Sequence, residues 1–234
     1  AANMPPVKVE IGLDFYLMQS RIRAMLTEKP AEALTHFEDR IQKGYSGNQL
    51  TGLKYGMAIA LQRQGSYRQA HDLLVELMNG DPGRLAYQLQ MASLDLEQKE
   101  IEGAVLRLGR LYHDFPGNHA IAMQYSEALL ANEDPQRAET ASIILRQQIL
   151  FREEDPVMYA LYAKSANIAG DHVRATEAIA ESYYQRGGIR EAIEQLEMLS
   201  KDEELDYYER ARISDRLTEM RIQMVAIRDS ERSG

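Results

Sequence analysis

The sequence predicts an all-α protein in which pairs of antiparallel helices repeat along the chain. Ala, Leu, Glu, Gln and Arg dominate its 234 residues, whereas Pro occurs 7 times and Gly 15 times, so the composition favours helix. From Leu13 onward, apolar residues follow helical periodicity in segments of about 12–16 residues, separated by short breaks rich in Gly, Asp or Pro. Several small residues recur 34 positions apart, which indicates one structural unit used more than once.

The first 12 residues are interpreted as an extended linker from an N-terminal domain that lies outside this sequence. Pro5 and Pro6 disfavour helix at their own positions and at the residues before them. The segment 15–41 then predicts a first helix pair, with Ala33 where later copies also carry Ala. This copy matches the others poorly, as terminal repeats often do.

Segments 52–82 and 86–116 are the clearest copies of the unit. Four positions match at a separation of 34 residues: Ala58 and Ala92, Tyr67 and Ile101, Ala70 and Ala104, and Pro82 and Pro116. Small residues let two helices approach closely, and the proline ends the second helix of each pair. The pattern resembles the tetratricopeptide repeat (TPR), whose helix pairs stack into a superhelix because one pair cannot cover its own apolar face.

Further copies follow at 121–145 and 157–180, and a shorter step follows them. Ala192 lies only 17 residues after Ala175, which is half of the 34-residue period. We interpret this step as a half-repeat, in which the helix 172–186 is the second helix of one pair and the first of the next. The pair Gly187-Gly188 is then a turn that ends this helix rather than a ligand loop. The predicted repeat array covers residues 13–202.

Residues 203–230 predict a C-terminal capping helix. Its apolar residues step by four and three along one face, while Arg, Asp and Glu cover the rest. The stripe consists of Ile213, Leu217, Met220, Met224 and Ile227. A polar outer surface of this kind closes the exposed end of a repeat array.

Several function classes are disfavoured by the sequence. The formal net charge of −9 opposes binding to nucleic acid, and no run of apolar residues is long enough for a membrane span. Cysteine is absent, and none of the five histidines has a metal-ligand spacing. No nucleophile elbow or phosphate-binding loop occurs either. We therefore expect no catalysis, metal or cofactor in this chain.

The first helix of each pair is expected to line a concave face that binds a protein or an extended peptide. The predicted partner-binding residues are Tyr55, Ile59, Arg63, Leu89, Ser93, Met123, Glu127, Lys164 and Asn167. The lining is mixed, and it lacks the Lys, Asn and Arg pattern with which some TPR modules clamp a C-terminal carboxylate. The alternative for the apolar members is packing against a neighbouring domain.

Two segments resemble a particular family. Residues 13–26 and 207–221 are similar to the C-terminal region of bacterial periplasmic zinc metalloproteases of the BepA type. The resemblance implies a C-terminal TPR domain, a periplasmic location, and a parent protein whose peptidase domain holds zinc through a His-Glu-x-x-His motif absent from this sequence. It also implies outer-membrane β-barrel substrates, their assembly machinery, or the protein's own peptidase domain as partners.

Three functions remain open at this point. The array could recruit or hold partners for the peptidase, or it could be an intramolecular regulator that covers the peptidase active site. It could also be a generic TPR adaptor or chaperone unrelated to proteolysis.

Overall fold

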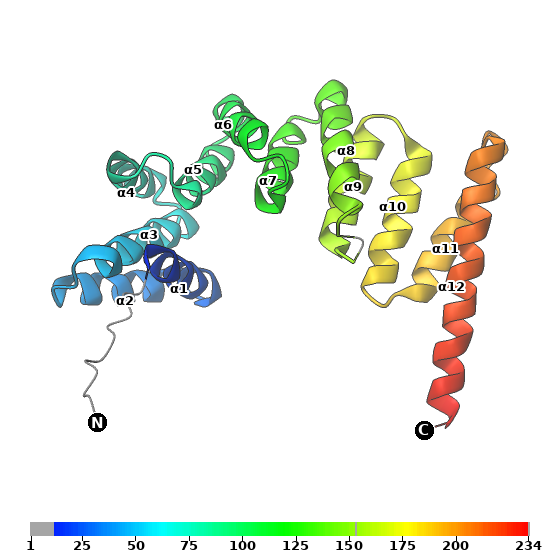
Figure 1. Cartoon of the computed structure of the whole chain (residues 1–234), viewed down its shortest axis with the longest axis horizontal. Coiled ribbons are helices and arrows are strands. Elements are labelled where there is room, and N and C mark those ends of the chain that lie inside the picture. The colour runs from blue at the N-terminus through cyan, green and yellow to red at the C-terminus, as the bar shows by residue number, and fades with distance from the viewer. Residues whose placement is uncertain (1–11, 153, 234) are drawn as a thin grey trace, which may run out of the picture. The chain divides into compact units, whose positions relative to one another are not determined.

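The computed structural model describes residues 12–152 and 154–233, and within these ranges the secondary structure is helical, without strands (Figure 1). The all-α prediction is confirmed. The helices are α1 (Leu13–Leu26), α2 (Pro30–Gln42), α3 (Gly47–Arg63), α4 (Tyr67–Gly80), α5 (Leu85–Glu97), α6 (Ile101–Asp114), α7 (His119–Leu129), α8 (Pro135–Ile149), α9 (Pro156–Ile168), α10 (His172–Gln185), α11 (Ile189–Leu199) and α12 (Tyr207–Ser233). They form two compact units, with the boundary between Arg107 and Leu108 inside α6.

The first unit is organised around α3, which packs against α1, α2 and α4. Its core contains Phe37 of α2, Ile59 of α3, Leu74 of α4 and Leu94 of α5. The predicted small residues also lie in this core, since Ala58 and Ala70 are fully buried. Helix α1 departs from the expected pairing because it packs along α3 and has few contacts with α2.

Two glycines in α3 explain the position of α1. A Cβ atom added at Gly52 would lie 2.6 Å from Cβ of Tyr16, and one added at Gly56 would lie 2.8 Å from Cβ of Ser20. Both distances are too short for a side chain, so only glycine permits this approach of the two helices. Gly52 and Gly56, which lie one helical turn apart in α3, therefore allow α1 to pack this closely against α3.

In the second unit, helix α10 packs against both α9 and α11, as the half-repeat predicts. The hydroxyl of Ser182 donates to the carbonyl of Pro156 at the start of α9 (2.9 Å), while Ala180 lies in one apolar cluster with Ala192 of α11. Gly187 ends α10 with a φ of 85°, and the amide of Gly188 donates to the carbonyl of Tyr183. This is a Schellman-type helix end, which agrees with the predicted turn.

Helix α12 begins at Tyr207, slightly later than predicted. Asp206 and Glu209 form a capping box, because the Asp206 carboxylate accepts from the Glu209 amide (2.7 Å) and the Glu209 carboxylate accepts from the Asp206 amide (2.9 Å). The predicted apolar stripe is buried from Ile213 to Met220, and its continuation at Met224 and Ile227 is exposed. The packed part of α12 is thus its N-terminal half.

Candidate functional site

Two of the predicted partner-binding residues of α3, Tyr55 and Ile59, are buried, whereas the third, Arg63, is exposed. Tyr55 and Ile59 each have 1% of their surface exposed. The Tyr55 hydroxyl accepts from the Arg21 guanidinium of α1 (3.4 Å) and donates to the Ala86 carbonyl (3.3 Å). Burial raises the pKa of this hydroxyl, and the positive charge of Arg21 opposes that shift. In this structure, neither Tyr55 nor Ile59 is accessible to a partner.

Arg63 holds the C-terminal end of α1. Its guanidinium donates to the carbonyl of Thr27 (2.8 Å) and also to the carbonyl of Ala24. The last carbonyls of a helix have no partner within the helix, and they carry the negative end of its dipole. Arg63 therefore satisfies the end of α1 with a positive charge, and its predicted contact with a partner stays a prediction.

A chain of polar side chains connects α1, α3 and α5. Arg21 donates to Gln90 (3.1 Å), Gln90 donates to Gln62 (2.7 Å), and Gln62 donates to Ser93 (3.0 Å). Gln62 and Gln90 are buried, so these bonds satisfy polar groups that would otherwise be costly to bury. Ser93 belongs to this network, and Leu89, the other predicted residue of α5, is partly buried.

The predicted residues of the second unit remain accessible. Glu127 of α7 and Lys164 and Asn167 of α9 are exposed, and Met123 of α7 is half-buried. Partial desolvation raises the pKa of the Glu127 carboxyl, and the nearby positive charge of Lys164 opposes the shift. Glu127 lies on α7 and Lys164 on α9, and these two helices contact each other. Their face combines a carboxylate, an ammonium group, an amide and an apolar side chain.

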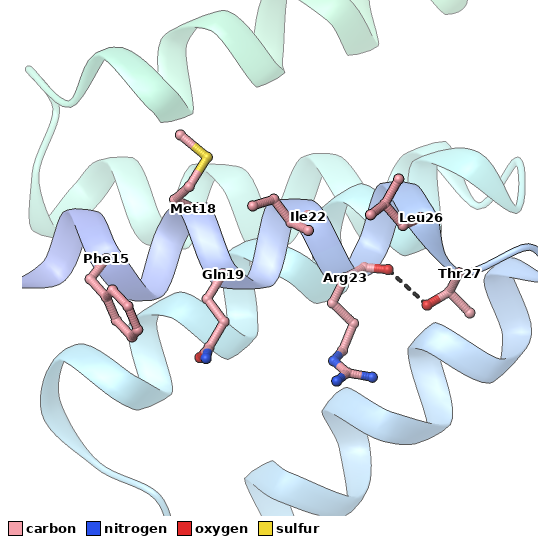
Figure 2. Close-up of a pocket in the computed structure, with 7 residues that line it drawn as sticks. All are labelled: Phe15, Met18, Gln19, Ile22, Arg23, Leu26 and Thr27. Carbon is pink, nitrogen blue, oxygen red and sulfur yellow. Dashed lines mark hydrogen bonds between the residues drawn. The ribbon is translucent and has the colours of Figure 1, made fainter.

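An exposed apolar surface on α1 was missed by the sequence reasoning. Figure 2 shows Met18, Ile22 and Leu26 pointing to one side of α1 in this view, and Phe15 to the other. Together with Met25, these side chains are between 50% and 80% exposed. We call Phe15, Met18, Ile22, Met25 and Leu26 the α1 stripe. The sequence contained one signal for this surface. Helix α1 carries apolar residues on more than one face, and a single packing partner cannot cover them all.

The described residues were searched for metal-binding clusters and for helices that could cross a membrane. Over residues 12–152 and 154–233, no three or more His, Cys, Asp or Glu side chains are arranged to hold a metal ion. In the same described part, no helix combines the length and the apolar character needed to cross a membrane.

Comparison with solved structures defines the class of fold. The MamA protein from Desulfovibrio magneticus RS-1 (its residues 41 to end) aligns with 75% of this chain and 95% of its own, with a TM-score of 0.56 and 18% identity. A tetratricopeptide repeat protein from Parabacteroides merdae aligns with 89% of this chain and 88% of its own, with a TM-score of 0.52 and 16% identity. The chain has the fold of a tetratricopeptide-repeat protein, and no family model matches its sequence.

Comparison with curated proteins identifies relatives of this chain by sequence. The chain is homologous to the beta-barrel assembly-enhancing protease of Escherichia coli K12, with 25% identity over 94% of its length. The protein of the same name from Yersinia pestis is 27% identical over 94% of the chain. The aligned part covers 44% and 45% of these relatives, so the chain spans less than half of their length. The resemblance inferred from residues 13–26 and 207–221 is thereby confirmed.

Proposed function

We propose that this chain is the non-catalytic, protein-binding part of a longer periplasmic zinc metalloprotease that acts in the assembly and quality control of outer-membrane β-barrel proteins. The homology to the beta-barrel assembly-enhancing protease over 94% of the chain carries the proposal. Helical-repeat arrays bind peptides and protein surfaces, and their function does not require chemistry of their own. The peptidase domain and its zinc ion would lie in another part of the longer protein.

The proposed partner is an outer-membrane β-barrel protein before it folds, or a component of the machinery that assembles it. A barrel strand alternates apolar and polar side chains, and before folding its backbone N–H and C=O groups are unpaired. In the second unit, Lys164 and Asn167 offer donors, Glu127 offers an acceptor, and Met123 offers an apolar contact. This combination supports the second unit as the place where an extended segment binds.

The test is a binding measurement on the Lys164→Glu variant. The substitution removes a donor and places a second carboxylate near Glu127, so we expect affinity for an unfolded barrel protein to fall about ten-fold, or about 1.4 kcal/mol. The probe is a fluorescently labelled outer-membrane β-barrel protein, diluted from urea and followed by fluorescence anisotropy.

The matched control is Lys201→Glu, which makes the same charge change at an exposed position of the same unit. Equal affinities of the two variants would contradict the role of the Lys164 face. Absence of binding by the unmodified chain would contradict an unfolded barrel protein as the partner.

A further inference from the structure

A polar cavity of about 320 Å³ lies in the second unit, between α8, α9 and the start of α10. Helix α9 packs against both of its neighbours, and one face of α8 and one face of α9 line the cavity. Tyr162 of α9 is part of this lining, whereas Lys164 and Asn167 are not. Side chains two or five residues apart on a helix point to opposite sides, so the cavity is separate from the face that carries Lys164.

Arg174 is held in a fixed position at the side of the cavity formed by α10. Its Nε atom forms an ion pair with one oxygen of the Asp171 carboxylate (3.1 Å), and the other oxygen accepts from the Arg174 amide (3.0 Å). A hydrogen bond to the Tyr162 hydroxyl is the main cause that raises the pKa of the Arg174 guanidinium. Both oxygens of Asp171 are thus engaged, while the guanidinium keeps N–H groups that neither contact uses.

The cavity contains more hydrogen-bond donors than acceptors. Arg146 of α8 supplies a second guanidinium, and its side chain forms no ion pair or hydrogen bond in the part of the chain that the structure describes. The Tyr162 hydroxyl accepts from Arg174, so its own proton is available for an acceptor. Of the two carboxylates in the lining, Asp171 is engaged, and Glu139 is exposed about two helical turns from Arg146. A ligand with acceptor atoms and a negative charge would complete this arrangement.

We propose that this cavity binds one carboxylate group of a polypeptide partner, held by Arg146, Arg174 and the Tyr162 hydroxyl. A carboxylate is planar and matches the geometry of a guanidinium group, which can donate two parallel hydrogen bonds to it. The two acidic residues of the lining balance its two arginines, so a group with a single negative charge fits better than a dianion such as phosphate. The site is independent of the proposed function, because it requires no barrel protein.

The apolar part of the lining indicates what is attached to the carboxylate. Ile143, Ala166 and Ala169 contribute small or aliphatic side chains, and Ile143 is 47% exposed. Such a wall accepts a short aliphatic group next to the charged one, as binding sites with a few placed polar groups commonly do. The carboxylate can come from the C-terminus of a polypeptide or from an Asp or Glu side chain, and the experiment distinguishes these sources.

NMR titration of the 234-residue chain tests the proposal, with methyl-labelled isoleucine as the reporter because Ile143 lines the cavity. One probe is the peptide acetyl-Gly-Ala-Val with a free C-terminal carboxylate, and the second is acetyl-Gly-Glu-Val-amide, whose carboxylate is on a side chain. Acetyl-Gly-Ala-Val-amide is the uncharged control. We expect at least one carboxylate peptide to shift the Ile143 methyl signal with an affinity about ten-fold or more above that of the control. The tighter of the two identifies the source.

Variants of the lining separate a carboxylate site from a general apolar contact. Arg146→Met keeps most of the side-chain volume at an exposed position, so we expect the affinity for the tighter peptide to fall about ten-fold. Tyr162→Phe removes only the hydroxyl and should lower the affinity by a few-fold. Glu139→Gln is the matched control on the same face of α8, and it should bind at least as tightly as the unmodified chain.

Three results would overturn the proposal. The first is that no peptide shifts the Ile143 signal, or that all three bind equally. The second is an unchanged affinity in both Arg146→Met and Tyr162→Phe. The third is a loss in Glu139→Gln as large as that in Arg146→Met. None of these measurements uses a barrel protein or changes Lys164, so their outcome is separate from that of the Lys164→Glu test.

Discussion

Ile59 lies in the core of the first unit, between α3 and the helices that cover it, with 1% of its surface exposed. Its position in the repeat is one that commonly faces a bound peptide, which is why it was predicted to contact a partner. The side chain is instead buried in the apolar core of the first unit. Repeat position determines the direction of a side chain, and the neighbouring helix determines whether that direction leads to solvent.

The substitution Ile59→Asp should therefore destabilise the first unit. It places an unpaired carboxylate in an apolar site and removes a packed side chain, so we expect the free energy of unfolding to fall by roughly 4 kcal/mol. Urea denaturation followed by far-UV circular dichroism measures this change. Ile59→Val is the control, with an expected loss of about 1 kcal/mol. A carboxylate variant as stable as the valine variant would show that the site is open to solvent.

The sequence contained signals at the residue scale that periodicity does not reveal. Gly52 and Gly56 lie four residues apart in α3, and this spacing indicates a close helix contact on that face. Gln62 and Gln90 could not be recognised as buried, because a glutamine on a helix is usually solvated and only the structure shows its partners. Glu127, Lys164 and Asn167 are exposed and Met123 is half-buried, and the role of these four residues in binding stays a prediction.

At the scale of elements, α12 is attached to α10 by two forked ion pairs. The Arg212 guanidinium binds the Glu177 carboxylate through two hydrogen bonds (2.7 and 2.9 Å), and Arg216 binds Glu181 in the same way. Arg216 also lies over the ring of Tyr184, 4.7 Å from its centre. A forked ion pair requires a specific geometry, whereas apolar packing does not. The two pairs therefore orient α12, while Ile213 and Leu217 contribute apolar packing.

The Arg216→Met variant tests this attachment. It keeps most of the side-chain volume and removes the fork, so we expect the free energy of unfolding to fall by about 1–2 kcal/mol. Arg190→Met is the matched control, because Arg190 pairs with Glu194 on the exposed surface of α11, where an ion pair contributes at most about 0.5 kcal/mol. Equal urea midpoints for the two variants would indicate that the fork adds nothing to the packing of α12.

The helices themselves were largely predictable, because small residues at a 34-residue period must lie where helices cross. Ala58 and Ala92, and likewise Ala70, Ala104 and Ala138, are all fully buried, as that argument requires. The placement of α1 was not predictable in the same way. A first helix with apolar residues on several faces can pack against more than one neighbour, and its pattern alone does not choose between α2 and α3.

At the scale of the whole molecule, the chain consists of two compact units whose boundary falls inside α6. Nothing in the sequence marks this boundary, because the 34-residue spacing continues through it from Ala92 to Ser126. A repeat array is held together by contacts between neighbours, so its parts can unfold separately.

We therefore expect Ile59→Asp to unfold the first unit and leave the second folded. Hydrogen–deuterium exchange read by mass spectrometry should show loss of protection in α2 to α5 and retained protection in α9 to α11. The unmodified chain under the same conditions is the reference. Simultaneous loss of protection in all helices would mean that the two units fold as one cooperative body.

Helix α10 also limits how this chain can be recombined. A cassette of a modular protein can be exchanged cleanly only at a junction where no helix serves both neighbours. A cut between Gly170 and Ile189 would separate α10 from α9 or from α11, both of which it contacts. A library built from this array should therefore keep α9, α10 and α11 together in one cassette.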